Sequence, residues 1–315
     1  MKPAVVVVGS LNMDFVVSMD RLPAPGETVL GRDFRMIPGG KGANQACAAG
    51  KLGGDAITVR MIGRVGYDVF ADHLKASLSA AGVDVSGVHA TRAQPTGVAL
   101  IWVDRAGQNS IVVASGANHE LAAADVEAMR QACRGAAIAL FQLETPLDTV
   151  EAALRLAREE GARTVLDPAP AQSLPAGLLD QIDILTPNES EAQLLSGGSA
   201  ARLLPLSEAS ALAESLRRLG PRTVILKLGD RGCLLLDDAG PRHFPAFRVE
   251  ARDTTAAGDT FNAALAIALA EGKPLVEAIP FANAAAAISV TRLGAQASAP
   301  SRAEVDQFIR GSGKL

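Results

Sequence analysis

Short apolar runs that alternate with segments of helical period restrict the fold of this chain more than any other feature. The first run, Ala4–Val8, is rich in β-branched residues and ends at Gly9-Ser10, as expected for a strand buried on both faces. Similar runs follow at Thr58–Ile62, Ala137–Gln142, Thr164–Leu166, Ile182–Leu185 and Thr223–Leu228. Most alternate with helical stretches such as Pro146–Glu160 and Glu208–Leu219. The pattern predicts an α/β three-layer sandwich with a mostly parallel central sheet.

Two stretches, Phe15–Ile37 and Gly97–Ser115, interrupt this alternation because neither has helical period. The second contains two apolar runs on either side of Arg105-Ala106-Gly107, which is typical of a hairpin with glycine at the left-handed position of its turn. Together they predict a small antiparallel β lid, inserted from about residues 15–37 and 97–115 into one α/β domain that spans residues 1–315. Such a lid could cover a site at the carboxyl ends of the strands, where open α/β sheets bind ligands.

The last third of the chain is expected to be mainly helical. Asp259–Glu271 is apolar and rich in alanine, and Gly272 follows it as a suitable residue to end a helix. Leu275–Thr291 also has helical character, and Pro280 is expected to divide it into two helical segments.

Charge and cysteine content exclude several classes of protein. The 315 residues carry 30 Lys and Arg against 34 Asp and Glu, without a run of like charge, which makes nucleic acid an unexpected partner. The 3 cysteines are far apart and form no Cys-x-x-Cys pair, as in a reduced, cytoplasmic protein. No apolar stretch approaches the ~18 residues of a membrane span, so no membrane partner is expected.

The segment after the first strand, Gly9–Asp14, contains the first candidate binding residues. In extended backbone Asn12 and Asp14 project from the same face, so that an amide and a carboxylate can contact one polar ligand. The alternative is that both are turn residues whose side chains satisfy nearby backbone groups.

A glycine-rich segment, Gly39–Asn44, precedes a helix that is predicted to run to about Gly50. Three glycines in four positions allow a ligand to reach backbone N–H groups at the helix N-terminus, and Lys41 and Asn44 add further donors. An ordinary tight turn before a helix would look similar. The segment is not a P-loop, because Gly42 rather than Ser or Thr follows Lys41.

The strongest signal is Asp253–Asn262, in which small residues open an apolar helix. Four consecutive backbone N–H groups and the helix dipole can stabilise developing negative charge there, and Asp259 can take a proton from an alcohol. This combination suits phosphoryl transfer. An aspartate in a first helical turn can also serve only to stabilise the helix dipole.

Gly39–Asn44 and Asp253–Asn262 together resemble the two signatures of the ribokinase-like carbohydrate kinases, the PfkB family, and the resemblance covers the whole chain. Further matching strings occur in the same order along the sequence: Gly9–Asp14, Pro25–Thr28, Gln142–Glu144, Thr186–Glu189, Leu228-Gly229 and Gly294–Gln296. The resemblance implies transfer of the γ-phosphoryl group of ATP to the 5-hydroxyl of D-ribose. It also implies a homodimer that pairs through the lid.

The resemblance assigns roles at the reacting end of the site. Asp259 matches the catalytic base, and the backbone of Ala256, Ala257 and Gly258 matches the anion hole that holds the migrating phosphoryl group. The positions that match sugar-binding residues are Asn12, Asp14, Gly40, Lys41, Gly42, Ala43, Asn44 and Glu144, together with Asp259.

Nucleotide and metal positions are also implied by the resemblance. The nucleotide positions are Asn188, Lys227, Leu228, Gly229, Asp230, Arg231, Gly232, Gly258 and Asn283. Glu191 matches an acidic residue that organises Mg²⁺ through water. Asp253, Thr255, Ser289, Arg292, Gly294 and Ser298 match a monovalent-cation site for K⁺, mostly through backbone carbonyls. The alternative is a loop that simply packs against the last helix.

Two departures from the family pattern concern the nucleotide strand. Lys227 replaces an expected threonine and Asp230 an expected serine, which brings a cation and an anion near the nucleotide.

The alternative functions are a kinase for deoxyribose, fructose or adenosine, and a non-catalytic sugar-binding regulator. An intact Asp259 disfavours the regulator, which has no need of a base beside an anion hole.

Overall fold

A nine-stranded sheet forms the middle of the molecule. The computed structural model describes residues 2–175, 177–199 and 203–312. The strand order is β13-β12-β11-β10-β9-β8-β1-β4-β5, and all pairs from β11 to β5 are parallel. The strands are β1 (Ala4–Val8), β4 (Thr58–Gly66), β5 (Val83–Thr91), β8 (Ala136–Phe141), β9 (Arg163–Leu166), β10 (Ile184–Leu185), β11 (Thr223–Lys227), β12 (Cys233–Asp237) and β13 (Gly240–Phe244). The predicted mostly parallel sheet is therefore confirmed, with an antiparallel β11–β12–β13 edge.

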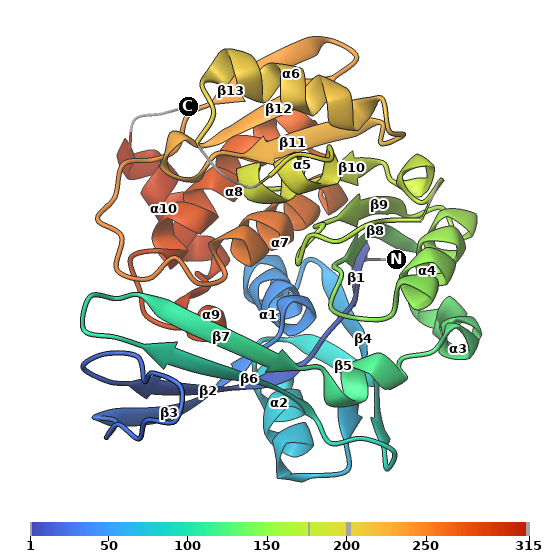
Figure 1. Cartoon of the computed structure of the whole chain (residues 1–315). Helices are drawn as coiled ribbons and strands as arrows, with labels where there is room; N and C mark the ends of the chain where they lie inside the picture. The colour runs from blue at the N-terminus through green and yellow to red at the C-terminus, as the bar shows by residue number, and fades with distance from the viewer. Residues whose placement is uncertain (1, 176, 200–202, 313–315) are drawn as a thin grey trace.

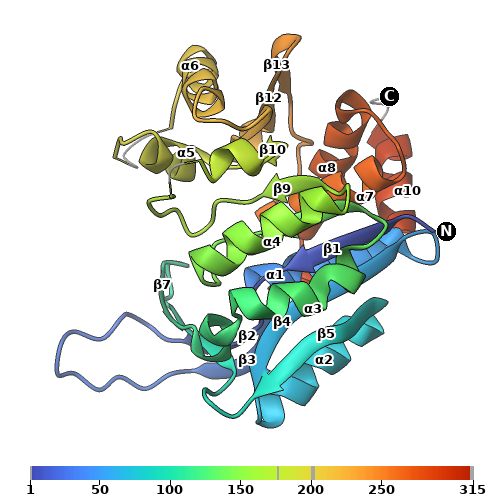
Figure 2. The ribbon, with the colours of Figure 1, turned by 90° about the vertical axis from the view of Figure 1, so that its right-hand side faces the viewer.

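Helices cover both faces of this sheet, as Figures 1 and 2 show. Alternate residues of β1 enter different cores: Val5 and Val7 pack on one face, and Val6 and Val8 on the other. The first face carries α1 (Lys41–Gly53), α2 (Val69–Ala80), α7 (Ala257–Ala270), α8 (Leu275–Ser289), α9 (Ala295–Ser298) and α10 (Arg302–Ser312). The second carries α3 (Ala123–Cys133), α4 (Leu147–Glu159), α5 (Glu189–Leu195) and α6 (Leu206–Arg217). The predicted three-layer sandwich is confirmed.

A second, four-stranded sheet projects from the larger one (Figure 1) and is the predicted lid. Its order is β3-β2-β6-β7, from β2 (Asn12–Ser18), β3 (Asp33–Gly39), β6 (Gly97–Val103) and β7 (Asn109–Ala114). The β2–β3 and β6–β7 hairpins are antiparallel, whereas β2 and β6 run parallel and join the two insertions. Figure 2 shows the long connection between β2 and β3 extending away from the body.

The structure corrects the prediction that Pro280 divides the last helical region. A single helix, α8, runs from Leu275 to Ser289 through Pro280. Proline removes one intrahelical hydrogen bond, but its neighbours Ile279 and Phe281 are both buried in the core, and their burial favours the continuous helix. Helix α1 also extends to Gly53, past the predicted end near Gly50.

The part of the chain that the structure describes also contains three short 3₁₀ helices: η1 (Gly116–Glu120), η2 (Leu179–Gln181) and η3 (Gly229–Arg231). Strand β5 and the β12–β13 hairpin were not among the predicted elements. Within the described ranges, none of the helices combines the length and the apolar character that crossing a bilayer requires.

Candidate active site

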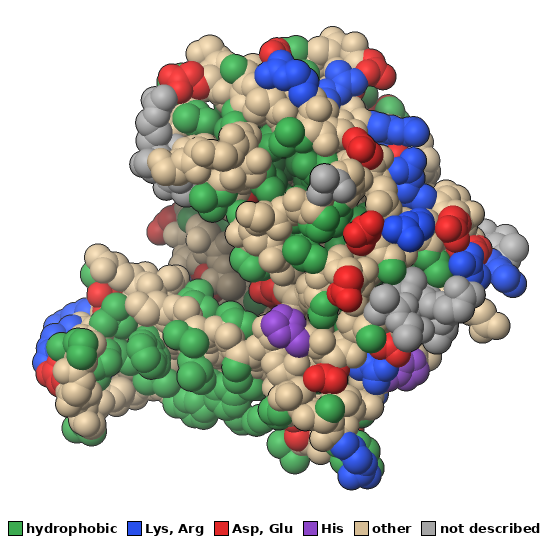
Figure 3. Space-filling model, turned by 45° about the vertical axis from the view of Figure 1, so that its right-hand side comes forward, with side chains coloured by type: hydrophobic (Ala, Val, Ile, Leu, Met, Phe, Trp, Pro, Cys, Tyr) green, Lys and Arg blue, Asp and Glu red, His purple; other side chains and the backbone are tan. Residues whose placement is uncertain are grey.

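The candidate residues meet where the parallel strands end and two helices begin. Ser10 follows β1, Glu144 follows β8, Asp167 follows β9, and Lys227 is the last residue of β11. Helices α1 and α7 start at the same edge, next to the lid. The space-filling view in Figure 3 shows the surface hollowed between the lid and the body. This is the edge at which open α/β sheets bind ligands.

The glycine-rich turn before α1 lies directly on the end of β1. Gly40 caps the helix with φ 87°, a conformation that favours glycine. A Cβ on Gly42 would lie 2.6 Å from the backbone N of Ser10, so only glycine fits this contact. The Ser10 hydroxyl and the Lys41 backbone N–H both donate to Glu144, at 2.5 and 3.1 Å. The N–H groups of Gly42 and Ala43 donate to the side-chain and backbone oxygens of Ser10, respectively, and these hydrogen bonds hold the turn in place.

Asn12 and Asp14 project from the same face of the lid strand β2, as predicted. The Asn12 side-chain oxygen accepts a hydrogen bond of 2.7 Å from Asn118, whose amide also bonds both backbone groups of Leu11. Asp14 lies against Gly39. Burial, followed by the negative charges of Glu144 and Asp259, raises the pKa of Asp14 to about 7.

The turn before α7 has the geometry of an anion-binding helix start. Ala256 caps the helix at φ 58°, the only positive φ of a non-glycine residue in the described part of the chain. This left-handed conformation costs energy for alanine and marks a turn whose shape is fixed by its surroundings. The first N–H groups of α7 have no acceptor within the helix, and that of Ala257 donates at 3.3 Å to Thr254 O in the preceding turn.

Asp259, in the first turn of α7, is 5% exposed and has two amide donors. Asn44 Nδ2 donates to one carboxylate oxygen at 3.0 Å, and Gln45 Nε2 donates to the other at 3.1 Å. Burial raises the pKa of Asp259, and the Lys41 ammonium together with the two amides opposes that rise. The carboxylate is thus oriented and more basic than an exposed aspartate.

Gln45, Asp167 and Lys227 extend this arrangement into a buried chain of polar groups. Gln45 Nε2 also donates to Asp167 at 3.2 Å, and the other oxygen of Asp167 pairs with Lys227 Nζ at 2.8 Å. Gln142 Nε2 in turn donates to Gln45 Oε1 at 2.7 Å. Sequence reasoning missed Gln45, Asp167 and Asn118. Gln45 follows Asn44 in a motif and Asp167 follows a predicted strand, which were the available signals.

The predicted nucleotide residues lie together beside β11. Asn188 forms a β-bridge with Lys227 and caps α5. Its side-chain oxygen accepts a hydrogen bond of 2.8 Å from the Glu191 N–H, and its own N–H donates to the Glu191 carboxylate at 2.7 Å. The η3 loop closes through Leu228 N–H to Gly232 O at 2.7 Å. Asn283 Nδ2 donates to the carbonyl oxygen of Phe244 at 3.4 Å. Phe244 in β13 pairs with Cys233 in β12, directly after the η3 loop, so Asn283 belongs to the same region. Asp230 is exposed on η3.

The residues predicted to surround a monovalent cation connect two loops. Asp253 accepts the N–H groups of Thr255 and Gly294 at 2.9 and 2.8 Å, and these bonds lower its pKa although burial alone would raise it. The hydroxyls of Ser289 and Ser298 donate to carbonyls one turn earlier, and Arg292 pairs with Glu304 at 2.6 Å. These loops offer carboxylate and carbonyl oxygens, which suit a hard cation.

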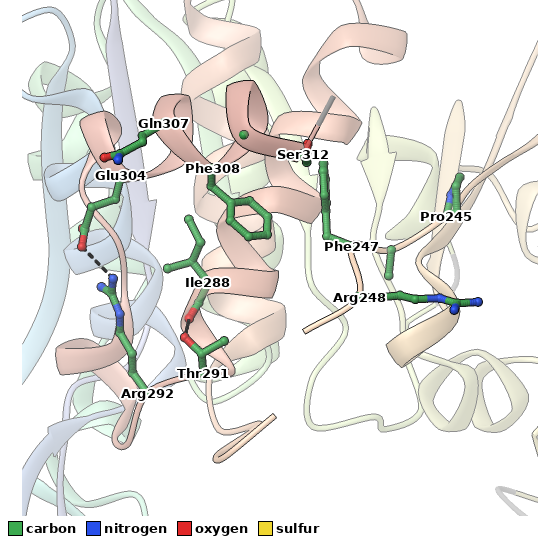
Figure 4. Close-up of a pocket in the computed structure, with 12 residues that line it drawn as sticks. Pro245, Phe247, Arg248, Ile288, Thr291, Arg292, Glu304, Gln307, Phe308 and Ser312 are labelled. Atoms are coloured by element: carbon green, nitrogen blue, oxygen red, sulfur yellow. Dashed lines mark hydrogen bonds and ion pairs between the residues drawn. The ribbon is translucent and has the colours of Figure 1, made fainter. Parts of the chain in front are cut away.

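A separate pocket of about 1060 Å³ lies between the Pro245–Arg248 segment, α8 and α10 (Figure 4). Its centre is apolar, with Phe247 and Phe308 in ring contact. Of the predicted site residues it contains only Arg292, so it is distinct from the site described above. Within residues 2–175, 177–199 and 203–312, no three His, Cys, Asp or Glu side chains are grouped to hold a metal ion.

Comparison with known proteins gives consistent matches over nearly the whole chain. The family model "pfkB family carbohydrate kinase" matches residues 2–302. A ribokinase of Haemophilus influenzae is 42% identical over 311 residues, covering 98% of this chain and 99% of the relative. The structure of a Thermotoga maritima ribokinase has 41% identity and a TM-score of 0.88, covering 98% and 100% of the two chains. An Arabidopsis thaliana ribokinase complexed with ribose and ATP has 34% identity and a TM-score of 0.88, covering 98% and 99%.

Proposed function

This chain belongs to the pfkB family of carbohydrate kinases, and from that premise we propose that it transfers the γ-phosphoryl group of ATP to the 5-hydroxyl of D-ribose. The products are D-ribose 5-phosphate and ADP. The observation that carries the proposal is the buried Asp259, held by Asn44 and Gln45 at the N-terminus of α7. Similarity to ribokinases over nearly the full length supports ribose as the acceptor.

The sugar lies between the lid and the start of α1 in this proposal. Asn12 and Asp14 contact its hydroxyls from the lid, while Lys41, Asn44 and Glu144 contact them from the body, where Gly40, Gly42 and Ala43 form the backbone of the pocket. Carboxylates and amides that converge from both sides suit a ligand rich in hydroxyl groups.

Asp259 acts as the general base. As the 5-oxygen forms its bond to the γ-phosphorus, the bond from that phosphorus to the β–γ bridging oxygen breaks, and the hydroxyl proton passes to the Asp259 carboxylate. The raised pKa of Asp259 favours its accepting this proton. The N–H groups of Ala256, Ala257 and Gly258 stabilise the charge on the transferred group.

The nucleotide lies against Asn188, the Lys227–Gly232 segment and Asn283, with its last phosphate at Gly258. Glu191 lies at this end and can hold a Mg²⁺ ion through water, since Mg²⁺ takes oxygen ligands from phosphates and one or two carboxylates. When bound, Mg²⁺ supplies positive charge to the phosphate oxygens.

This function is tested by measuring ADP release from MgATP in the presence of K⁺. D-ribose, 2-deoxyribose, fructose, adenosine and no sugar are compared in parallel. A strong preference for ribose is expected. Preference for another alcohol would retain the mechanism but change the substrate. If no sugar stimulates ADP release while sugars still bind, the chain is a non-catalytic binding protein and the proposal is wrong.

The affinity for ribose is expected to depend on the charge of Asp14. Because its pKa is about 7, lowering the pH from 8 to 5 neutralises the carboxylate and weakens its hydrogen bonds to sugar hydroxyls. The KM for ribose should therefore rise below pH 7, approaching about tenfold per pH unit. Asp14→Asn should have a high KM that no longer varies over this range. A pH-independent KM in the unmodified enzyme would contradict the role of Asp14.

A K⁺ ion coordinated around Asp253, Thr255, Ser289, Arg292, Gly294 and Ser298, mostly through carbonyls, would hold the anion-hole turn in place without entering the reaction. Asp253 supports this, because it already connects Thr255 to Gly294. Replacing K⁺ by a large organic cation at constant ionic strength is expected to lower kcat several-fold. An unchanged kcat would show that this cation site has no role.

We also propose a homodimer formed through the lid, in the cytoplasm. One face of the lid sheet presents exposed apolar side chains from three strands, visible at the lower left of Figure 3: Phe34, Met36, Leu100, Trp102 and Val112. Such a patch favours association. Trp102→Glu is expected to shift the protein from dimer to monomer in sedimentation velocity. A monomeric unmodified protein would contradict this interface.

The three free cysteines suit a reducing compartment such as the cytoplasm.

A further inference from the structure

Lys227 places a positive charge where the nucleotide strand meets the start of α7. It is the last residue of β11, and its side chain is only 14% exposed. Its Nζ atom lies 2.8 Å from Asp167 Oδ1 and 3.2 Å from the position that a Cβ would take on Gly258. The ammonium group therefore lies next to the turn to which the phosphoryl group is assigned.

A purely structural role explains this pair poorly. Asp167 follows β9 and Lys227 is the last residue of β11, and β10 lies between these strands, so the pair connects strands that are not neighbours. Both side chains are largely removed from water, and a buried ion pair often contributes no more stability than apolar residues of the same size. The charge itself is therefore the feature to be explained.

Lys227 lies among carboxylates at this end of the site. The charge of Asp167 acts on both Glu191 and Asp259, Lys227 acts on Glu191, and Lys41 acts on all three carboxylates. A nucleotide brings further negative charge to this side of the site. Without a fixed cation at Gly258, the transferred group would face the carboxylates of Asp167 and Asp259 directly.

We propose that Lys227 is a catalytic residue whose ammonium contacts the γ-phosphoryl group as it moves from ATP to the sugar, and that Asp167 is the positioning residue that holds this ammonium against Gly258. This inference rests on the proposed function. Lys227 takes no part in the proton transfer, because the proton of the sugar hydroxyl goes to Asp259. The Gln45 amide donates to both Asp167 and Asp259, so it fixes the residue that positions Lys227 relative to the general base.

Three variants of the full chain separate this role from simple neutralisation of Asp167: Lys227→Met, Asp167→Asn and the double variant. Lys227→Met leaves a buried carboxylate unpaired and should lower the melting temperature. The double variant has neither charge, so its melting temperature should return close to that of the unmodified protein. Its kcat should nevertheless stay on the order of 10²-fold low. If kcat recovers together with stability, Lys227 only pairs with Asp167 and the inference is wrong.

Calorimetric affinities of the double variant for AMP, ADP and a non-hydrolysable ATP analogue provide a second readout. The loss of affinity should grow with the number of phosphates and be largest for the analogue. Equal losses for all three would also overturn the inference. Lys273→Met is a matched control, because Lys273 pairs with Glu271 away from the site and its loss should leave kcat unchanged. If the unmodified protein phosphorylates no sugar, the proposed function fails, while these affinities still decide the position of Lys227.

Discussion

Asp259→Asn is expected to lower the kcat for ribose phosphorylation by on the order of 10²–10⁴-fold and to leave ribose affinity nearly unchanged. Asparagine has almost the same shape but cannot take the proton of the sugar hydroxyl. Its amide would also face one of the two donors, Asn44 Nδ2 or Gln45 Nε2, that now serve the carboxylate. Steady-state kinetics at saturating MgATP, with ribose affinity from calorimetry, would measure both effects.

The pH profile distinguishes a base from a residue that only shapes the site. In the unmodified enzyme kcat should fall on acidification as Asp259, whose pKa is raised by burial, becomes protonated. That acid limb should be absent from Asp259→Asn. Asp68→Asn is the matched control, because Asp68 is likewise an aspartate at a helix start that accepts several hydrogen bonds, in its case from backbone N–H groups, but it caps α2 outside the site. Full activity of Asp259→Asn would remove the general-base role.

The fold was predictable because its central strands are buried on both faces. Ala4–Val8 is apolar at every position, and β1 has exactly these bounds with all five residues buried. Where the prediction failed, tertiary packing was decisive. Pro280 is a local helix-breaking signal, but the burial of Ile279 and Phe281 keeps α8 continuous.

Candidate site residues could be named from the sequence where a short motif holds them. Asn12, Asp14, Asn44 and Asp259 each belong to a segment with its own local pattern. Asp167 was missed because its role depends on Gln45 and Lys227, which lie 122 and 60 positions away in the chain. Long-range hydrogen bonds of this kind have no local sequence pattern. The departure at Lys227 was visible, but its partner was not.

Gln45→Leu is the second change with a large expected effect, and it acts on stability. Gln45 is fully buried. Its side-chain amide donates to Asp167 and Asp259 and accepts a hydrogen bond from Gln142. Leucine fills the space but leaves two buried carboxylate oxygens and one buried amide donor without this partner. The free energy of unfolding should fall by about 3–5 kcal/mol, as measured by urea denaturation. Gln172→Leu, which removes one hydrogen bond at the surface, should cost less than about 1 kcal/mol.

The dependence of this loss on pH shows whether charge or packing causes it. Gln45 lowers the pKa of Asp259 through its hydrogen bond, so its removal raises that pKa further above the unfolded value. An acid with a raised pKa in the folded state binds more protons folded than unfolded, and its contribution to stability falls as the pH rises. The deficit of Gln45→Leu relative to the unmodified protein should therefore be larger at pH 8 than at pH 5. A deficit of equal size at both pH values would mean that lost packing, and not the buried charge of Asp259 without its hydrogen bond from Gln45, destabilises the variant.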